Sequence, residues 1–153
     1  MKNVSLFLTL LLCLMSALPG HAEPKNVTDF NSLVDKYFDF YFSFHPSEAT
    51  AEGFHQYDQK LEDYSAAAHA QQIRGLKEYL SKFEAVDGSK LPPYTAGDRE
   101  WIISSIHAGL LELEDIQMWK KDPDGYTSGV TNSIFVIMKR NYAAPEERLR
   151  AAI

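Results

Sequence analysis

The chain has 153 residues, of which 45% are apolar and 24% charged, and its formal net charge is −6. Such a length and composition are typical of one modest globular domain or of part of one. The basic residues are dispersed along the chain, so they form no stripe that could follow a polyanion. An acidic chain of this kind is a poor partner for nucleic acid and for an anionic membrane surface.

The first 22 residues have the pattern of a secretory signal peptide. Lys2 supplies the positive start, and residues 6–14 form an apolar stretch that only one Thr interrupts. Small residues then lead to Ala22, so we expect cleavage between Ala22 and Glu23. The prediction is an exported protein in the periplasm or the extracellular space.

A transmembrane anchor is the alternative for this segment. Its apolar core, residues 4–18, is shorter than the roughly 20 residues that a bilayer requires. We therefore expect residues 1–22 to be removed and residues 23–153 to have no membrane anchor. Cys13 is the only cysteine, so the mature chain has no disulfide and depends on a packed apolar core.

The spacing of apolar residues predicts an all-α fold. A first helix over residues 29–44, capped by Thr28, carries one continuous apolar face. Six of the last eight residues of this helix, from Tyr37 to Phe44, are aromatic. One face does not need so many rings, so we expect a core helix with contacts on more than one side rather than an aromatic ligand cage.

The stretch "HPSEATAEGFHQYD", residues 45–58, reads as turn, short helix, turn. The residue before Pro46 is pushed out of the α region, which ends the first helix. Ser47 is the expected cap of the short helix, and Gly53 its end.

Further helices follow by the same reasoning. Ser65 caps a helix with a buried stripe, and Thr95 starts a long helix that runs to about Lys120. The last two are a helix over residues 130–140 and one that starts at Ala144-Pro145, although residues 134–137 have the propensity of a strand. The members of the buried stripe are Ile73, Leu76, Leu80 and Phe83.

The search for catalytic chemistry is mostly negative. No His is followed by Glu in the spacing that a zinc peptidase helix uses. His55 and Asp58, three residues apart, are the candidate pair for a metal, but no third ligand is evident, and hydrogen bonds that hold a loop are the favoured interpretation. Glu112, Glu114 and Asp115 are expected on a solvated acidic face.

The order of the fragments is more specific than any one of them. "HPSEATAEGFHQYD", "LEDYS", "LPPYTAGDREWI", "LEDIQMWKKDPDGY" and "APEERL" follow one another along the chain. In that order they resemble the N-terminal portion of the bacterial family known as domain of unknown function 885. The resemblance covers essentially all of the mature chain.

The resemblance implies the N-terminal part of a larger, mainly helical, zincin-like metallopeptidase. The zinc-binding segment of the family, His-Glu-x-x-Pro-Gly-His, has no counterpart in this sequence. No catalytic or metal-binding residue can therefore be transferred from the family to this chain. We expect no cofactor in this chain and zinc in the full-length protein. The implied partners are the missing C-terminal catalytic part and a peptide substrate.

The family picture places His55, Tyr57 and Asp58 where they could line the substrate cleft. The last predicted helix has no stop signal, so we expect residues 23–153 to be an incomplete domain that is inactive alone. The alternative is a free-standing exported helical module that binds a partner without catalysis.

Overall fold

The computed structural model describes residues 24–153, which form helices, turns and loops without a strand. The predicted all-α class is therefore confirmed, and the strand alternative for residues 134–137 is wrong. The expected cleavage site at Ala22 and Glu23 lies outside the described residues. The α-helices are α2 (Lys25–Phe44), α3 (Pro46–Glu52), α4 (Ala66–Glu84), α5 (Pro93–Leu110), α6 (Met118–Lys121), α7 (Asp124–Lys139) and α8 (Pro145–Ala152).

Three short turns connect these helices. The 3-10 turn η1 (His55–Tyr57) follows α3, and the 3-10 turn η2 (Gly88–Lys90) precedes α5. A π-helical turn, η3 (Leu111–Ile116), continues α5.

α2 begins earlier than the sequence analysis predicted and ends where it predicted. The helix starts at Lys25 directly after Pro24, and Thr28 lies in its first turn with Oγ1 3.4 Å from the carbonyl oxygen of Pro24. The helix ends at Phe44 because His45, at φ −127° and ψ 56°, has left the helical region, as the residue before a proline does.

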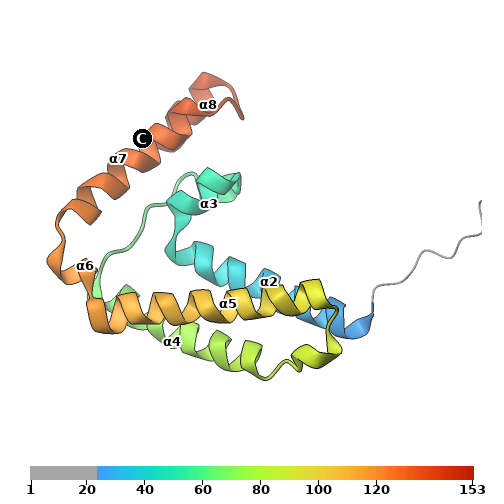
Figure 1. The fold of residues 1–153 in the computed structure, drawn as a ribbon. Helices are drawn as coiled ribbons and strands as arrows, with labels where there is room; N and C mark the ends of the chain where they lie inside the picture. The colour runs from blue at the N-terminus through green and yellow to red at the C-terminus, as the bar shows by residue number, and fades with distance from the viewer. Residues whose placement is uncertain (1–23) are drawn as a thin grey trace, which may run out of the picture.

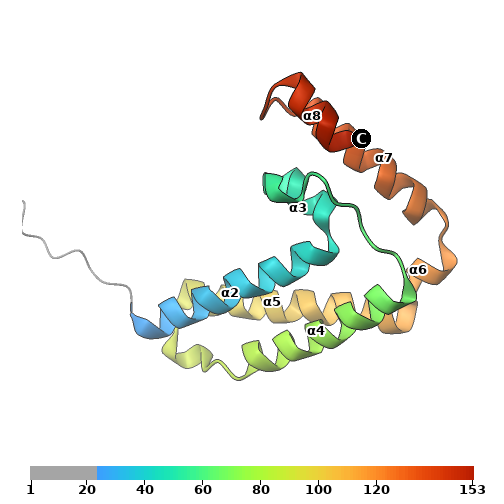
Figure 2. The same ribbon diagram turned by 180° about the vertical axis from the view of Figure 1, so that it is seen from behind.

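Helices α2, α4 and α5 form the base of the molecule, with α4 in contact with both of the others (Figures 1 and 2). Phe83 is fully buried between them, and its ring meets Phe30 and Tyr37 edge-on at centroid distances of 6.0 and 5.6 Å. Edge-to-face pairs of this kind stabilise beyond their buried area. The core cluster comprises Phe30, Tyr37, Leu76, Phe83, Leu91, Ile102, Ile106 and Leu110.

The predicted stripe of α4 therefore faces this core: Leu76 and Phe83 are buried, and Ile73 and Leu80 pack against the cluster. One glycine sets how closely α2 approaches. A methyl group on Gly75 would overlap the ring of Phe40, so only glycine allows this contact.

The ends of α4 are both capped by side chains. Ser65 accepts a hydrogen bond from the amide of Ala68 at 3.1 Å, as predicted. At the other end Arg99 of α5 donates to the carbonyl oxygens of Phe83 and Glu84, each at 3.0 Å. A cation at the C-terminal carbonyls is favoured by the helix dipole, so Arg99 ties α5 to the end of α4.

The predicted long helix from Thr95 to Lys120 is not continuous. α5 begins at Pro93 rather than Thr95, because a proline at the first helical position has its φ already set. After Leu110 the chain widens into η3, and Gln117 adopts a left-handed conformation at φ 56°. This residue breaks the helix before α6 and redirects the chain.

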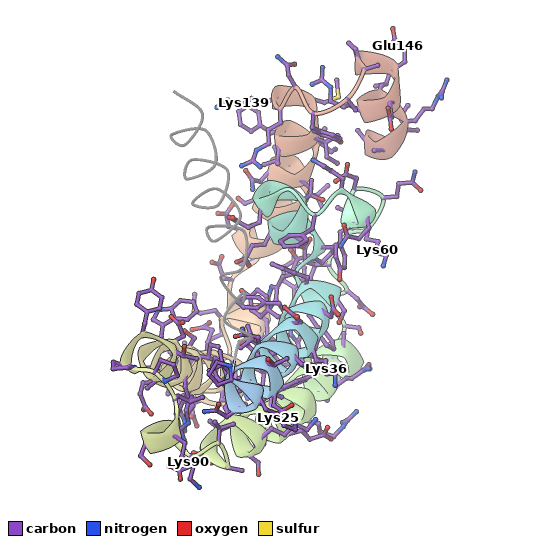
Figure 3. All side chains as sticks on the ribbon, turned by 90° about the vertical axis from the view of Figure 1, so that its right-hand side faces the viewer. Lys25, Lys36, Lys60, Lys90, Lys139 and Glu146 are labelled. Atoms are coloured by element: carbon purple, nitrogen blue, oxygen red, sulfur yellow. The ribbon has the colours of Figure 1, made fainter. Side chains whose placement is uncertain are left out.

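Helices α7 and α8 form an arm that extends away from the base, with α3 between them and the base (Figures 1 and 2). α7 starts at Asp124, earlier than the predicted Val130, and α8 starts at Pro145 as predicted. In Figure 3 the labelled Lys139 and Glu146 lie at the opposite end of the molecule from Lys25. No helix within residues 24–153 is long and apolar enough to cross a bilayer.

Two polar contacts hold the arm. Ser47 of α3 lies 2.7 Å from Ser133 of α7, hydroxyl to hydroxyl, and also donates to Glu62 at 2.7 Å. Ser133 has one proton, which it gives either to Ser47 or to the carbonyl oxygen of Gly129. Ser47, the predicted cap of α3, thus joins α3 to α7 instead, and His45 stands at the cap position.

The second contact is the buried guanidinium of Arg148, which closes the corner between α7 and α8. It donates to the carbonyl oxygens of Met138, Arg140 and Ala143 at 2.6 to 3.1 Å. The carbonyls at a helix C-terminus lack partners within the helix, so Arg148 satisfies those at the end of α7.

Candidate functional site

A cavity of about 440 Å³ lies between α2 and α5, with Leu76 of α4 in its lining. Such a volume is typical of a small-ligand site, which lies in the range of roughly 300–1,000 Å³. Rings and apolar side chains make most of its wall: Tyr37, Phe38, Tyr41, Leu76, Trp101 and Leu113. Its polar lining consists of His45, Glu48, Gln72, Ser105 and Glu112.

His45 stands at the turn between α2 and α3 and is uncharged at neutral pH. Its ring stacks on Tyr41 at a centroid distance of 4.3 Å, and its Nε2 lies 2.8 Å from the amide nitrogen of Gln72. With the Gln72 amide in this orientation, Nε2 accepts and the ring proton is on Nδ1. Burial lowers the pKa of His45, more than the nearby carboxylates of Glu48 and Glu62 raise it.

The sharp turn at residues 45 and 46 folds α3 back over the end of α2 and brings Glu48 to Tyr41. The Tyr41 hydroxyl donates to Glu48 at 2.8 Å. Burial and this carboxylate raise the pKa of Tyr41, so the phenol stays protonated and remains a donor. Burial, with Glu48 as the lesser cause, also raises the pKa of Tyr37 to about 12.

A second cavity, of about 590 Å³, adjoins the first and shares Phe38, Tyr41 and Glu48 with it. Within the described residues, no Lys or Arg lines either cavity. The remaining lining of the second cavity is Asp35, Asp39, Phe42, Glu52, Phe54 and Gln56. The two cavities together therefore combine aromatic walls with carboxylates.

The predicted pair His55 and Asp58 lies in η1 and directly after it, on the side that faces α8. Nδ1 of His55 is 3.2 Å from Oδ2 of Asp58, and the hydroxyl of Thr50 donates to Oδ1 at 2.9 Å. The hydrogen bond expected between His55 and Asp58 is thus present. Asp58 is only 8% exposed, and these two bonds offset part of the cost of burying its charge.

Tyr142 completes this cluster, although the sequence analysis did not select it. Its ring stacks on His55 at a centroid distance of 3.7 Å. Burial and the carboxylate of Asp58 raise the pKa of Tyr142 to about 12, yet its buried hydroxyl forms no hydrogen bond of standard geometry within the described residues. The carboxylate of Asp58 is thus a close neighbour of the phenol.

His55 and Asp58 border a hollow of about 750 Å³ together with Tyr142 and Lys60. Tyr57 lies elsewhere, buried against Phe42 and Ala49 in a second small core cluster. That these predicted residues line a substrate cleft stays a prediction. A carboxylate only accepts hydrogen bonds, so Nδ1 of His55 is the donor to Asp58.

A metal site requires several ligands close together. Within residues 24–153 no group of three or more His, Cys, Asp or Glu residues is placed to hold a metal ion. Two of the acidic residues of the predicted long helix have different surroundings. Glu114 pairs with Lys77 at 2.7 Å, and Glu112 borders the first cavity.

The sequence analysis missed the residues that make the two cavities polar. For Glu48 a signal exists, because a helix that restarts directly after a proline turn folds back on its predecessor. For Gln72 and Glu112 no local signal exists, since their approach to His45 and Glu48 depends on the packing of α4 and η3 against α2.

The fold and the cavities together define an all-helical protein with an aromatic, acidic groove beside a three-helix core. The chain matches a family of bacterial proteins of unknown function, DUF885, over residues 46–153. This match spans more than half of the chain, which therefore belongs to that family. No curated protein and no solved structure matches it.

Proposed function

We propose that this chain is the N-terminal helical portion of a larger exported protein that resembles zinc-dependent metallopeptidases. In this role it serves as scaffold and as one wall of a cleft and is inactive alone. Membership of DUF885 over residues 46–153 supports the proposal. The ordered sequence fragments carry the resemblance to peptidases.

The observation that carries the scaffold role is the apolar outer face of α7. Side chains spaced four apart lie along one side of a helix, so they form a continuous stripe. The stripe is exposed here, and Phe135 beside it is 56% exposed. Its members are Tyr126, Val130, Ile134 and Met138.

An exposed apolar stripe of this kind marks an interaction surface. We assign it to further helices of the same protein, because ridges of one helix pack into the grooves of another along such a face. The arm would then place the corner between α7 and α8, and the nearby His55 and Asp58, next to the catalytic part of the larger protein.

Zinc belongs to the expected full-length protein and not to this portion. Residues 24–153 do not fit a zinc site, because no three potential ligands converge in them. No step of peptide hydrolysis is therefore assigned to the residues of this chain.

The coding DNA tests the proposal directly. We expect the sequence after the codon for Ile153 to continue, in frame or after one frameshift, into a helical region with His-Glu-x-x-Pro-Gly-His. Its two His and a downstream carboxylate would be metal ligands, and its Glu would activate water. Several hundred downstream codons without this segment in any frame would refute the peptidase relation.

Sedimentation of the chain without its predicted signal peptide, residues 23–153, tests whether the stripe is an interaction surface. We expect concentration-dependent association that the double variant Ile134→Ser, Phe135→Ser abolishes. Tyr94→Ser is the matched control, since Tyr94 is 85% exposed and lies on α5 outside the stripe. A monomeric wild-type chain at all concentrations, with a cooperative melt, would contradict the scaffold role.

A free-standing binding module is the second candidate function. The two adjoining cavities favour it, because they are built from α2, α3, η1, α4, α5 and η3 without any further chain. A native stop codon directly after Ile153, together with a monomeric folded chain, would decide for this candidate.

A further inference from the structure

We infer that the two adjoining cavities form one groove that binds a peptide segment with at least two basic side chains. The inference does not depend on the proposed scaffold role, since the groove is complete within this chain. We call it the acidic groove. It is lined by the residues of both cavities, with Phe38, Tyr41 and Glu48 as their shared wall.

The charge of the acidic groove favours a cationic ligand. Five carboxylates line the acidic groove, and none of them forms an ion pair with a Lys, Arg or His among the described residues. They are Asp35, Asp39, Glu48, Glu52 and Glu112.

The titratable groups that face these carboxylates leave the charge uncompensated. Tyr37 and Tyr41 stay protonated phenols, and burial keeps His45 uncharged at neutral pH. Carboxylates gathered in a concave surface with low-dielectric walls focus the potential and raise the local concentration of cations.

The aromatic wall of the acidic groove also favours cationic side chains. A cationic side chain gains from a ring face as well as from a carboxylate, and its apolar stem packs on rings while its head stays polar. In the first cavity Trp101 stands opposite α2, and its side chain is 64% exposed. In the second cavity Phe42 and Phe54 lie 4.9 Å apart, centroid to centroid, beside Glu52.

The acidic groove is divided into two cavities. The two cavities, of about 440 and 590 Å³, each have room for one large side chain together with solvent. A single small amine would occupy only one of them. A ligand with two cations separated by an apolar spacer reaches both cavities across the shared Glu48, and a peptide with alternating Lys and Phe provides this spacing.

Fluorescence anisotropy at low salt measures the binding of labelled, end-blocked peptides to residues 23–153. We expect a peptide of alternating Lys and Phe to bind, and peptides with Gln or Glu in place of Lys to bind at least roughly tenfold more weakly. Binding should weaken as salt rises, because the attraction is screened. Equal affinity for the Lys and Glu peptides overturns the inference, as does binding of spermine without binding of the Lys peptide.

Matched variants locate the site. Glu48→Gln keeps the shape and an acceptor for Tyr41, and we expect it to weaken binding of the Lys peptide roughly tenfold. Glu146→Gln removes the same charge at the far end of the molecule (Figure 3) and should leave binding unchanged. An equal effect of the two variants would place binding outside the groove.

Trp101→Ala provides a second variant that does not depend on the fold, since this side chain is largely exposed. We expect it to weaken binding at least threefold with an unchanged circular dichroism melt; unchanged binding would overturn the inference. Failure of these peptide tests leaves the stripe of α7 untouched, and failure of the sedimentation test leaves the groove untouched, so the two proposals are tested separately.

Discussion

The base of α2, α4 and α5 and the arm of α7 and α8 use similar apolar content in opposite ways. In the base, Phe83 is fully buried and ringed by aromatic neighbours. In the arm, Phe135 is 56% exposed and Ile137 is the one buried apolar side chain of α7. The difference lies in what each helix packs against.

The helices of the base share the core cluster around Phe83, whereas α7 has its main contacts with α3 and α8 and contributes no buried residue to that cluster. Burial of apolar side chains supplies most of the favourable free energy of folding. The base therefore holds most of the stability of the described chain, and the arm depends on polar contacts at Ser47 and Arg148. Helicity alone does not reveal this difference.

The largest expected effect breaks the base. Phe83→Ala should lower the free energy of unfolding by about 3–5 kcal/mol, because it removes a fully buried ring and leaves a cavity. Phe135→Ala, on the exposed face of α7, should change it by less than about 0.5 kcal/mol. Urea denaturation of both variants measures the contrast, and a similar loss in both would contradict it.

The next effect breaks the arm alone. Arg148→Ala leaves the carbonyls of Met138, Arg140 and Ala143 without their donor, at a cost of about 1.5–3 kcal/mol. Hydrogen exchange should speed up in α7 and α8 and stay unchanged in α4. Arg150→Ala, at an exposed position of α8, is the control.

Loss of protection throughout the molecule in Arg148→Ala would show that base and arm unfold as one unit. Arg148→Lys sharpens the result, since it keeps the charge but not the planar fork that reaches three carbonyls.

Substitution of two glycines in the base by alanine should change the stability in opposite directions. Gly75→Ala should destabilise the chain by about 1–2 kcal/mol, because the added methyl group overlaps Phe40 and this exceeds the gain in helix propensity. Gly97→Ala meets nothing within 4 Å in α5 and should stabilise by about 0.5–1 kcal/mol. Thermal melts of the two variants compare them, and destabilisation by both would refute the role of the close contact.

The smallest expected effect is a pH dependence of the stability, which arises from His45 and His69. Burial lowers the pKa of His45 and of His69, with partial opposition from Glu48 and Glu62 for His45 and from Asp63 for His69. The folded chain thus binds protons less readily than the unfolded chain, in which a His titrates near pH 6.5. Stability from this source is full above that pH and is lost as the pH falls below it.

We expect the Tm to fall by a few degrees between pH 7.5 and pH 5.5. His69→Leu should reduce this fall, because both ring nitrogens of His69 are buried without a hydrogen-bond partner within the described chain. An unchanged pH dependence in this variant would leave His45 as the remaining source, and His45→Gln measures its share.

That the chain is helical was predictable, but the starts of the helices and the break in the predicted long helix were not. Thr28, Ser47 and Thr95 were the expected caps or starts, whereas the helices begin next to prolines, at Lys25, Pro46 and Pro93. A proline presets φ and loses no hydrogen bond in the first turn, so it competes with a Ser or Thr cap a few residues later. At Ser65, where no proline is near, the predicted cap is correct.

The candidate site was predictable only where its residues are close in sequence. His55 and Asp58 are three residues apart, and their hydrogen bond follows from that spacing. Glu112 lies in η3 and lines the cavity of Glu48, and apolar periodicity gives no sign of a π-turn. Gln117 is likewise unforeseeable, since a non-glycine residue adopts a left-handed conformation only when the surrounding packing holds it there.

The contact between Ser47 and Ser133 has a consequence for the order of folding. The two residues are 86 positions apart in the sequence. At a synthesis rate of about 5–20 residues per second, α3 emerges roughly 4–17 seconds before the residue that it will hold. During that interval the neighbouring helices α2, α4 and α5 close short loops first, because loop entropy and contact order favour local pairs. Ser47 has a nearer partner in Glu62, only 15 residues away, so loop entropy favours this contact over the one with Ser133 early in folding.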